Sequence, residues 1–288
     1  MYSRYNIRKS FTLLLWLLTA SQLSFAKSAD LHELVESTKL QHYSDITFFL
    51  RLPQHPAKTD EHTRTIGRKG QSVRGVLALC THRTEPQDVK INVTDDGRFK
   101  WFVKFADEHN LALVIWTNFK GYRTDISGDE MDEDRYKQYD KDFEDRAGEW
   151  RTGFRRLCRK YDLPEKNVLM YGISGWAQMA HRLALRMPEF FFDVHVHVNG
   201  SYDQIKDDGN QILWLVTTGT QEYGYPAGVR FYRDALDAGY HMIFRAHETL
   251  GHSYSADKRV TGIAFWEYCM KFLPDATDPG WGTVLDFE

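Results

Sequence analysis

A serine placed to act as a nucleophile lies between two glycines in the second half of the chain. Ser174 follows Gly172 and precedes Gly175, at the point where an apolar run gives way to a helical pattern. Residues 167–171 have the composition of a buried strand, and small apolar side chains then recur at helical spacing until Pro188. A strand that becomes a helix within one residue strains that residue, and small neighbours let the two elements approach closely. We therefore expect the serine hydroxyl to stand exposed beside the free N–H groups of a helix N-terminus.

The serine departs in one respect from the G-x-S-x-G pattern. Gly172 occupies the position two residues before Ser174, but Trp176 occupies the position two residues after it. A turn of glycine and serine between a strand and a helix also occurs without any catalytic role. The assignment therefore depends on whether the chain supplies partners for the serine.

A serine hydroxyl is a poor nucleophile until a base takes its proton, so a histidine is the first partner to find. His252 lies in the loop 247–254, which follows a predicted strand at 241–246 and leads into the last predicted helix. Gly251 allows the tight turn that would bring this imidazole over the edge of the sheet. His247 is closer to the strand end and is the alternative base, with His252 preferred.

The second partner is a carboxylate that orients the histidine. Glu222 comes just past Gly219, after a predicted strand, and Asp203, after the preceding strand, is the alternative acid. Such a carboxylate holds the imidazole in one tautomer and stabilises its charged form. Ser174, Glu222 and His252 each follow a separate predicted strand, in the chain order serine, acid, histidine that hydrolases of this sheet type use.

The elements that would position these side chains alternate between strands and helices. This alternation is typical of an α/β protein, and we predict a doubly wound, mainly parallel sheet of eight strands flanked by helices. The run 111–117 is so apolar that both faces of that strand must be covered. Seven of the strands can be assigned to residues, namely 46–52, 73–80, 111–117, 167–171, 192–198, 212–218 and 241–246. The predicted helices are residues 97–109, 131–161, 177–187, 228–238 and 258–272.

Five short segments carry a likeness to a known family: the Ser174 elbow, Gly219 to Glu222, Gly251-His252-Ser253, Gly175-Trp176-Ala177-Gln178 and Ala180-His181-Arg182. The first three resemble the triad segments of the α/β-hydrolase superfamily. The last two are similar to segments of secreted esterases of the polyhydroxybutyrate depolymerase and dienelactone hydrolase kind. The resemblance covers roughly residues 46–272, and it implies the α/β-hydrolase fold, a serine nucleophile and a covalent acyl-enzyme.

The resemblance also implies an oxyanion hole built from two backbone N–H groups. One would be the N–H of Gly175, the residue after the nucleophile. The other would come from the loop 81–84, where Arg83 or His82 could serve. This loop lacks the glycine-rich pattern that many relatives carry, and its side chains could narrow the site.

Two other groups of polar residues are weaker candidates for a site. His195 and His197 alternate along one predicted strand and would face the same side of it, but no third ligand at metal-binding spacing accompanies them. The carboxylates of 129–145 are mixed with arginine and lysine, which favours a solvated helix face over a metal site. We therefore predict no metal and no cofactor.

Aromatic side chains are frequent in the loops expected at the sheet edge that carries Ser174. They could line a cleft for an aromatic acyl group or a sugar, or they could be ordinary loop packing. These residues are Tyr122, Tyr223, Tyr225 and Tyr254, with Trp116 at a strand end nearby.

The first residues predict export from the cytoplasm. Three positive charges precede an apolar run at 11–20, and Ser24-Phe25-Ala26 places small residues at the cleavage-determining positions, which is typical of a signal peptide, here residues 1–26. The run is too short for a typical spanning helix, so no stable membrane span is expected after cleavage, although an uncleaved anchor is the alternative. The protein is then secreted or periplasmic.

The remaining residues, 27–288, have a length suited to one domain. Cleavage removes three positive charges and changes the formal net charge from −3 to −6, so nothing basic suggests a nucleic acid partner. Cys80, Cys158 and Cys269 do not resemble a disulfide framework and are expected to be buried apolar side chains.

These observations lead to a hypothesis of function. The preferred one is a secreted serine hydrolase that cleaves a small-molecule or polymeric carboxylic ester. A serine peptidase or an acyl transferase would use the same three residues. The missing glycine-rich loop and Trp176 motivate a different alternative, a non-catalytic binding module on a hydrolase scaffold.

Overall fold

The computed structural model describes the chain over residues 36–39, 46–53, 73–80, 99–117, 133–205, 211–252 and 256–273. The predicted signal peptide lies outside these residues. His82, Arg83, Tyr122 and Tyr254 also lie outside them. The same holds for residues 129–132, where the carboxylate-rich segment begins. Among the described residues, no helix combines the length and the apolarity needed to cross a bilayer.

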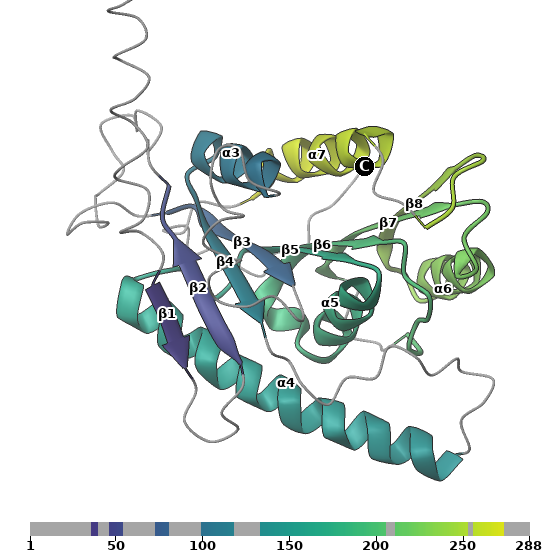
Figure 1. The fold of residues 1–288 in the computed structure, drawn as a ribbon, viewed down its shortest axis with the longest axis horizontal. Helices are drawn as coiled ribbons and strands as arrows, with labels where there is room; N and C mark the ends of the chain where they lie inside the picture. The colour runs from purple at the N-terminus through teal and green to yellow at the C-terminus, as the bar shows by residue number, and fades with distance from the viewer. Residues whose placement is uncertain are drawn as a thin grey trace, which may run out of the picture. The chain divides into compact units, whose positions relative to one another are not determined.

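The described strands form one sheet in the order β1-β2-β4-β3-β5-β6-β7-β8. β2 is antiparallel to both of its neighbours, and the six strands from β4 to β8 are parallel (Figure 1). The prediction of a doubly wound, mainly parallel sheet is confirmed. The strands are β1 Glu36–Lys39, β2 Thr47–Arg51, β3 Gly75–Cys80, β4 Leu111–Thr117, β5 Val168–Ile173, β6 Phe191–His197, β7 Leu213–Gly219 and β8 His241–His247.

The helices cover both faces of the sheet. α3 and α7 lie on one face, and α4, α5 and α6 lie on the other (Figure 1). β3 and β7 are buried along their whole length, and β5 is buried except at its last residue, so this two-sided cover explains their apolar runs. The helices are α3 Lys100–Glu108, α4 Glu133–Tyr161, α5 Gly175–Arg186, α6 Tyr225–Asp237 and α7 Ala256–Cys269, with a short 3₁₀ helix, η2, at Pro188–Phe190.

Tryptophans and phenylalanines fill the core between α4 and the sheet. The Trp150 ring stacks on Phe154 with centroids 4.8 Å apart and meets the Trp116 ring edge-on at 5.4 Å. All three side chains are fully buried. Of the two alternatives for Trp116, packing is the one that holds, because this side chain lies in the core.

The three cysteines are buried and form no disulfide. Cys80, Cys158 and Cys269 are each buried and unbonded, as the sequence predicts. Burial raises the pKa of Cys158 to about 12, so this thiol stays protonated near neutral pH.

Candidate active site

Ser174 forms a one-residue turn between β5 and α5. Its backbone has φ 57° and ψ −128°, a conformation that residues other than glycine rarely adopt. The Ser174 N–H donates a hydrogen bond of 2.9 Å to the carbonyl of His197, and the Ser174 carbonyl accepts hydrogen bonds from Ala177 and Gln178 at 2.9 and 3.2 Å. These bonds hold the strained strand-to-helix turn that the sequence predicts.

Gly172 lets the strand and the helix approach each other at this turn. A Cβ at this position would lie 2.8 Å from the Ala180 methyl group and would overlap the carbonyl of Trp176. The first turn of α5 therefore packs directly on the backbone of β5. Trp176 is half-buried against the core, so it occupies the position after the turn without displacing the helix.

His252 connects Ser174 to Glu222. The Nε2 atom of His252 lies 2.9 Å from the Ser174 Oγ atom, and its Nδ1 atom lies 2.9 Å from the Glu222 Oε1 atom. Because an ionised carboxylate can only accept hydrogen bonds, Nδ1 donates to Glu222 and Nε2 accepts from the serine hydroxyl. The three side chains form one continuous hydrogen-bonded chain.

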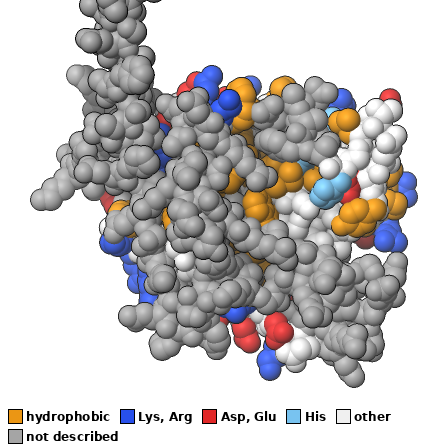
Figure 2. Space-filling view, viewed as in Figure 1, with side chains coloured by type: hydrophobic (Ala, Val, Ile, Leu, Met, Phe, Trp, Pro, Cys, Tyr) orange, Lys and Arg blue, Asp and Glu red, His pale blue; other side chains and the backbone are white. Residues whose placement is uncertain are grey.

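Glu222 and His252 differ in their exposure to solvent. The Glu222 side chain is fully buried, whereas 47% of the His252 side chain is exposed. The carboxylate is therefore shielded from water, and the imidazole remains open to an incoming molecule. Histidine, acidic and hydrophobic side chains meet at the surface on the face of the molecule shown in Figure 2.

The loops that carry Glu222 and His252 are bonded to each other. The N–H of Thr220 donates to the carbonyl of His247, and the N–H of Gln221 donates to the carbonyl of Leu250, both at 3.0 Å. The loop after β7 and the loop after β8 thus behave as one unit. This pairing fixes the acid relative to the histidine.

The alternative base, His247, has a different position. Its side chain is buried at the end of β8, close to His195. The structure places His252, and not His247, against Ser174.

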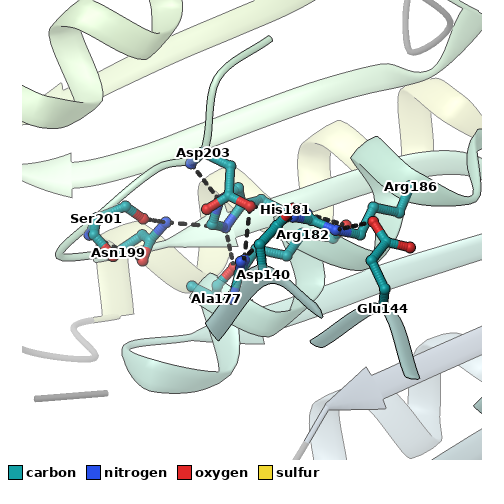
Figure 3. A network of polar contacts seen from close by, with 9 residues as sticks. All are labelled: Asp140, Glu144, Ala177, His181, Arg182, Arg186, Asn199, Ser201 and Asp203. Atoms are coloured by element: carbon teal, nitrogen blue, oxygen red, sulfur yellow. Dashed lines mark hydrogen bonds and ion pairs between the residues drawn. The ribbon is translucent and has the colours of Figure 1, made fainter. Parts of the chain in front are cut away.

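The alternative acid, Asp203, binds α5 through its side chain (Figure 3). Its Oδ2 atom accepts hydrogen bonds from Arg182 Nε at 2.7 Å and Arg186 Nη1 at 2.8 Å. The same two arginines bind Asp140 of α4, and Arg186 also binds Glu144. These two carboxylates of the charged segment are thus held by arginines instead of facing only solvent.

His181, which also lies on α5, connects the backbone of Asp203 to the beginning of that helix. Its Nε2 atom accepts a hydrogen bond from the Asp203 backbone N–H at 3.0 Å, so its Nδ1 atom carries the proton and donates to the Ala177 carbonyl at 3.2 Å. Burial lowers the pKa of His181 to about 4; Asp203 opposes that change, and Arg182 adds to it. The imidazole is therefore neutral at neutral pH.

His195 and His197 share a single hydroxyl, that of Thr217. The His195 Nε2 atom lies 2.8 Å from Thr217 Oγ1, and the His197 Nδ1 atom lies 2.6 Å from it. Both histidines are buried and lie on the same side of β6, as their alternation predicts. The sequence does not identify Thr217 as a partner, because the match depends on the pairing of β6 with β7. The backbone carbonyl of His197 also accepts the hydrogen bond from the Ser174 N–H. This cluster therefore stabilises the turn at Ser174.

We expect the free energy of unfolding to fall as the pH is lowered from about 6.5 toward 4. Burial lowers the pKa of His195 to about 3, and nearby His247 adds to this effect. His181 and His195 therefore take up protons near pH 6.5 only when the chain unfolds. Each costs about 1.4 kcal/mol of stability per pH unit below that value. Asp193 offsets part of this loss, because burial raises its pKa well above the usual value.

Urea unfolding at several pH values within this range measures the net loss, which is at most about 2.7 kcal/mol per pH unit for the two histidines. In a His181→Asn variant the slope should be smaller by about 1.4 kcal/mol per pH unit, whatever the variant's stability at neutral pH. An unchanged slope would show that His181 is not the responsible group.

The expected oxyanion donors are only partly within the described residues. The N–H of Gly175 is the first in α5 and lies next to the serine, at the positive end of the helix. Arg83 and the alternative His82 lie outside the described residues. Of the tyrosines expected at this edge, Tyr225 packs on Phe244 at 6.2 Å, and Tyr223 flanks His252 at 6.4 Å.

Comparison of the chain with known proteins gives matches in structure alone. No protein-family model matches the sequence, and no curated protein is similar to it in sequence. Esterases from Rhizomucor miehei match with a TM-score of 0.54 and 8% identity, over 83% of this chain and 84% of theirs. A carboxylesterase from Bacillus cereus matches with a TM-score of 0.51 and 10% identity, over 74% of this chain and 96% of its own.

A third similar structure is a candidate dipeptidyl aminopeptidase IV from Bacteroides ovatus, with a TM-score of 0.55 and 12% identity over 83% of this chain. The match spans only 35% of the length of that protein. At such low identities the likeness concerns the fold. Together with the strand order, it shows that the chain has the α/β-hydrolase fold.

Proposed function

We propose that the protein is a serine hydrolase that cleaves carboxylic esters. The observation that carries the proposal is the hydrogen-bonded chain from Ser174 through His252 to the buried Glu222. Nucleophile, base and orienting acid are the three roles that acyl transfer to a serine requires. The 2.9 Å separation of Ser174 and His252 favours catalysis over a binding module that has lost its chemistry.

In the proposed reaction, the Ser174 Oγ atom attacks the ester carbonyl while His252 Nε2 takes the hydroxyl proton. The carbonyl oxygen becomes negatively charged, and the Gly175 N–H stabilises it at the positive end of α5. His252 then gives the proton to the leaving alcohol oxygen, and the C–O bond breaks to leave an acyl-serine. Water, deprotonated by His252, then attacks the acyl-serine. His252 returns the proton to the Ser174 Oγ atom as the acyl C–O bond breaks, and the acid is released.

Glu222 acts in both steps through the imidazole. While Nε2 holds the serine proton, the ring is positively charged, and a carboxylate 2.9 Å from Nδ1 stabilises that charge. Because no part of the Glu222 side chain is exposed, water does not screen this interaction.

A fluorophosphonate probe tests the proposal directly, since it reacts only with a serine that a base activates. We expect stoichiometric labelling, and peptide mapping should place the label on Ser174. Ser174→Ala should not be labelled, and His252→Gln should be labelled far more slowly. A folded wild-type protein that stays unlabelled would overturn the proposed function.

A panel of substrates then separates esterases from the related classes. Esters should be hydrolysed in preference to matched amides, and polyesters belong in the panel because the proposed substrate is small or polymeric. A preference for amides would indicate a peptidase, and transfer to an added alcohol in place of water would indicate an acyl transferase.

We also propose that the chain is exported and that residues 1–26 are removed as a signal peptide. The protein would then act as one secreted or periplasmic domain, residues 27–288. N-terminal sequencing of the exported protein should begin at Lys27. A protein that keeps its first residues and stays with the membrane would indicate an uncleaved anchor instead.

A further inference from the structure

We propose that Tyr223 is a binding platform for an aromatic ring in the leaving alcohol of the substrate. The preferred esters are then those of phenols or of other alcohols that carry a planar ring next to the ester oxygen. This inference rests on the proposed function, and it adds the substrate class.

Tyr223 is exposed to a degree that packing does not explain. Its exposed fraction is 74%, the highest among the large hydrophobic side chains of the described residues. Burying such a ring against a partner is favourable, so an exposed one beside a reactive group indicates a contact surface.

The ring is nevertheless held in place at one end. A Cβ at Gly200 would lie 2.7 Å from the Tyr223 Cζ atom and would overlap its hydroxyl oxygen. The hydroxyl end therefore lies directly against Gly200, in the loop after β6. A ring restrained at one end loses less conformational freedom on binding than a free one, which lowers the entropy cost.

The position of Tyr223 determines which part of the substrate it meets. Its ring lies beside the His252 imidazole, with centroids 6.4 Å apart and planes inclined by 25°. His252 has to give its proton to the leaving oxygen, so that oxygen must come within hydrogen-bond reach of Nε2. A ring attached to the leaving oxygen is thus brought to the same side as Tyr223.

The neighbouring tyrosines pack against other aromatic rings. Tyr202 stacks on Phe231 at 4.6 Å, and Tyr225 packs on Phe244 at 6.2 Å. Of the tyrosines described at this edge, Tyr223 is the one that offers an open face beside His252.

The test compares two esters of the same acid whose leaving alcohols have similar acidity: a phenyl ester and a hexafluoroisopropyl ester. The measured quantity is kcat/KM, which reports acylation, the step in which the alcohol departs. Tyr223→Leu should lower kcat/KM for the phenyl ester about 3- to 10-fold more than for the fluoroalkyl ester. Tyr223→Phe keeps the ring and should preserve the wild-type ratio.

Two controls make the result specific. Tyr268→Leu removes another exposed tyrosine, near the end of α7, and should leave the ratio unchanged. A hexafluoroisopropyl benzoate carries its ring in the acyl part, so Tyr223→Leu should not affect it selectively. A selective loss on the benzoate would place Tyr223 on the acyl side and overturn the assignment.

Equal losses on both esters, or no loss, would also overturn the proposal. Fluorophosphonate labelling keeps this failure distinct from failure of the proposed function. If the wild type and Tyr223→Leu are both labelled at Ser174 while the ester ratio does not change, only the role of Tyr223 is wrong. If the folded wild type is not labelled, the function itself is wrong.

Discussion

Replacement of Ser174 by alanine is expected to lower kcat for ester hydrolysis by about 10⁴- to 10⁶-fold. The variant keeps His252, Glu222 and the backbone donors, but no oxygen remains to form the acyl-enzyme. What activity remains comes from water attacking a bound and polarised ester. Hydrolysis of an activated aryl ester, followed with substrate in excess, measures the loss.

The backbone of Ser174 supplies an internal control for this experiment. Alanine retains the strain of φ 57° and ψ −128°, whereas glycine tolerates that conformation. Ser174→Gly should therefore be as inactive as Ser174→Ala but more stable, by about 1 kcal/mol. Retained activity in both folded variants would mean that Ser174 is not the nucleophile.

The sequence predicts most of the fold because buried parallel strands consist of uninterrupted apolar runs. The runs at 111–117 and 212–218 correspond to β4 and β7 with boundaries within one residue. β1 is a different case, because Glu36–Lys39 contains no apolar side chain. Its backbone pairs with β2, and this pairing has no signature in residue type.

The candidate site is predictable to the extent that chain order and strand ends determine it. Ser174, Glu222 and His252 each follow a strand, and the structure brings their side chains together. The choice between Glu222 and Asp203 could not be made firmly from the sequence, since both follow strands of the same edge. The deciding partners of Asp203 are Arg182 and Arg186, one helical turn apart on α5. That spacing was visible, but which carboxylate the two arginines face depends on packing.

Replacement of Glu222 by glutamine is expected to lower kcat by about 10³- to 10⁴-fold while KM changes little. The amide has nearly the same size, so the buried pocket is still filled. The lost negative charge no longer stabilises the imidazolium, and the amide can hold His252 in the wrong tautomer. Steady-state kinetics on the same aryl ester, with the melting temperature as a check on folding, measures this effect.

Asp203→Asn is the matched control, because it makes the same chemical change in the carboxylate that the sequence left as the alternative. Asp203 binds buried Arg182, so its loss should cost stability, on the order of 3 kcal/mol, and leave kcat of the folded protein within a few-fold of wild type. The two variants therefore differ in what they lose. Glu222→Gln loses turnover at constant stability, and Asp203→Asn loses stability at nearly constant turnover. The opposite pattern would move the orienting acid from the loop after β7 to the loop after β6, and it would require His252 to turn away from the 2.9 Å contact that it makes with Glu222.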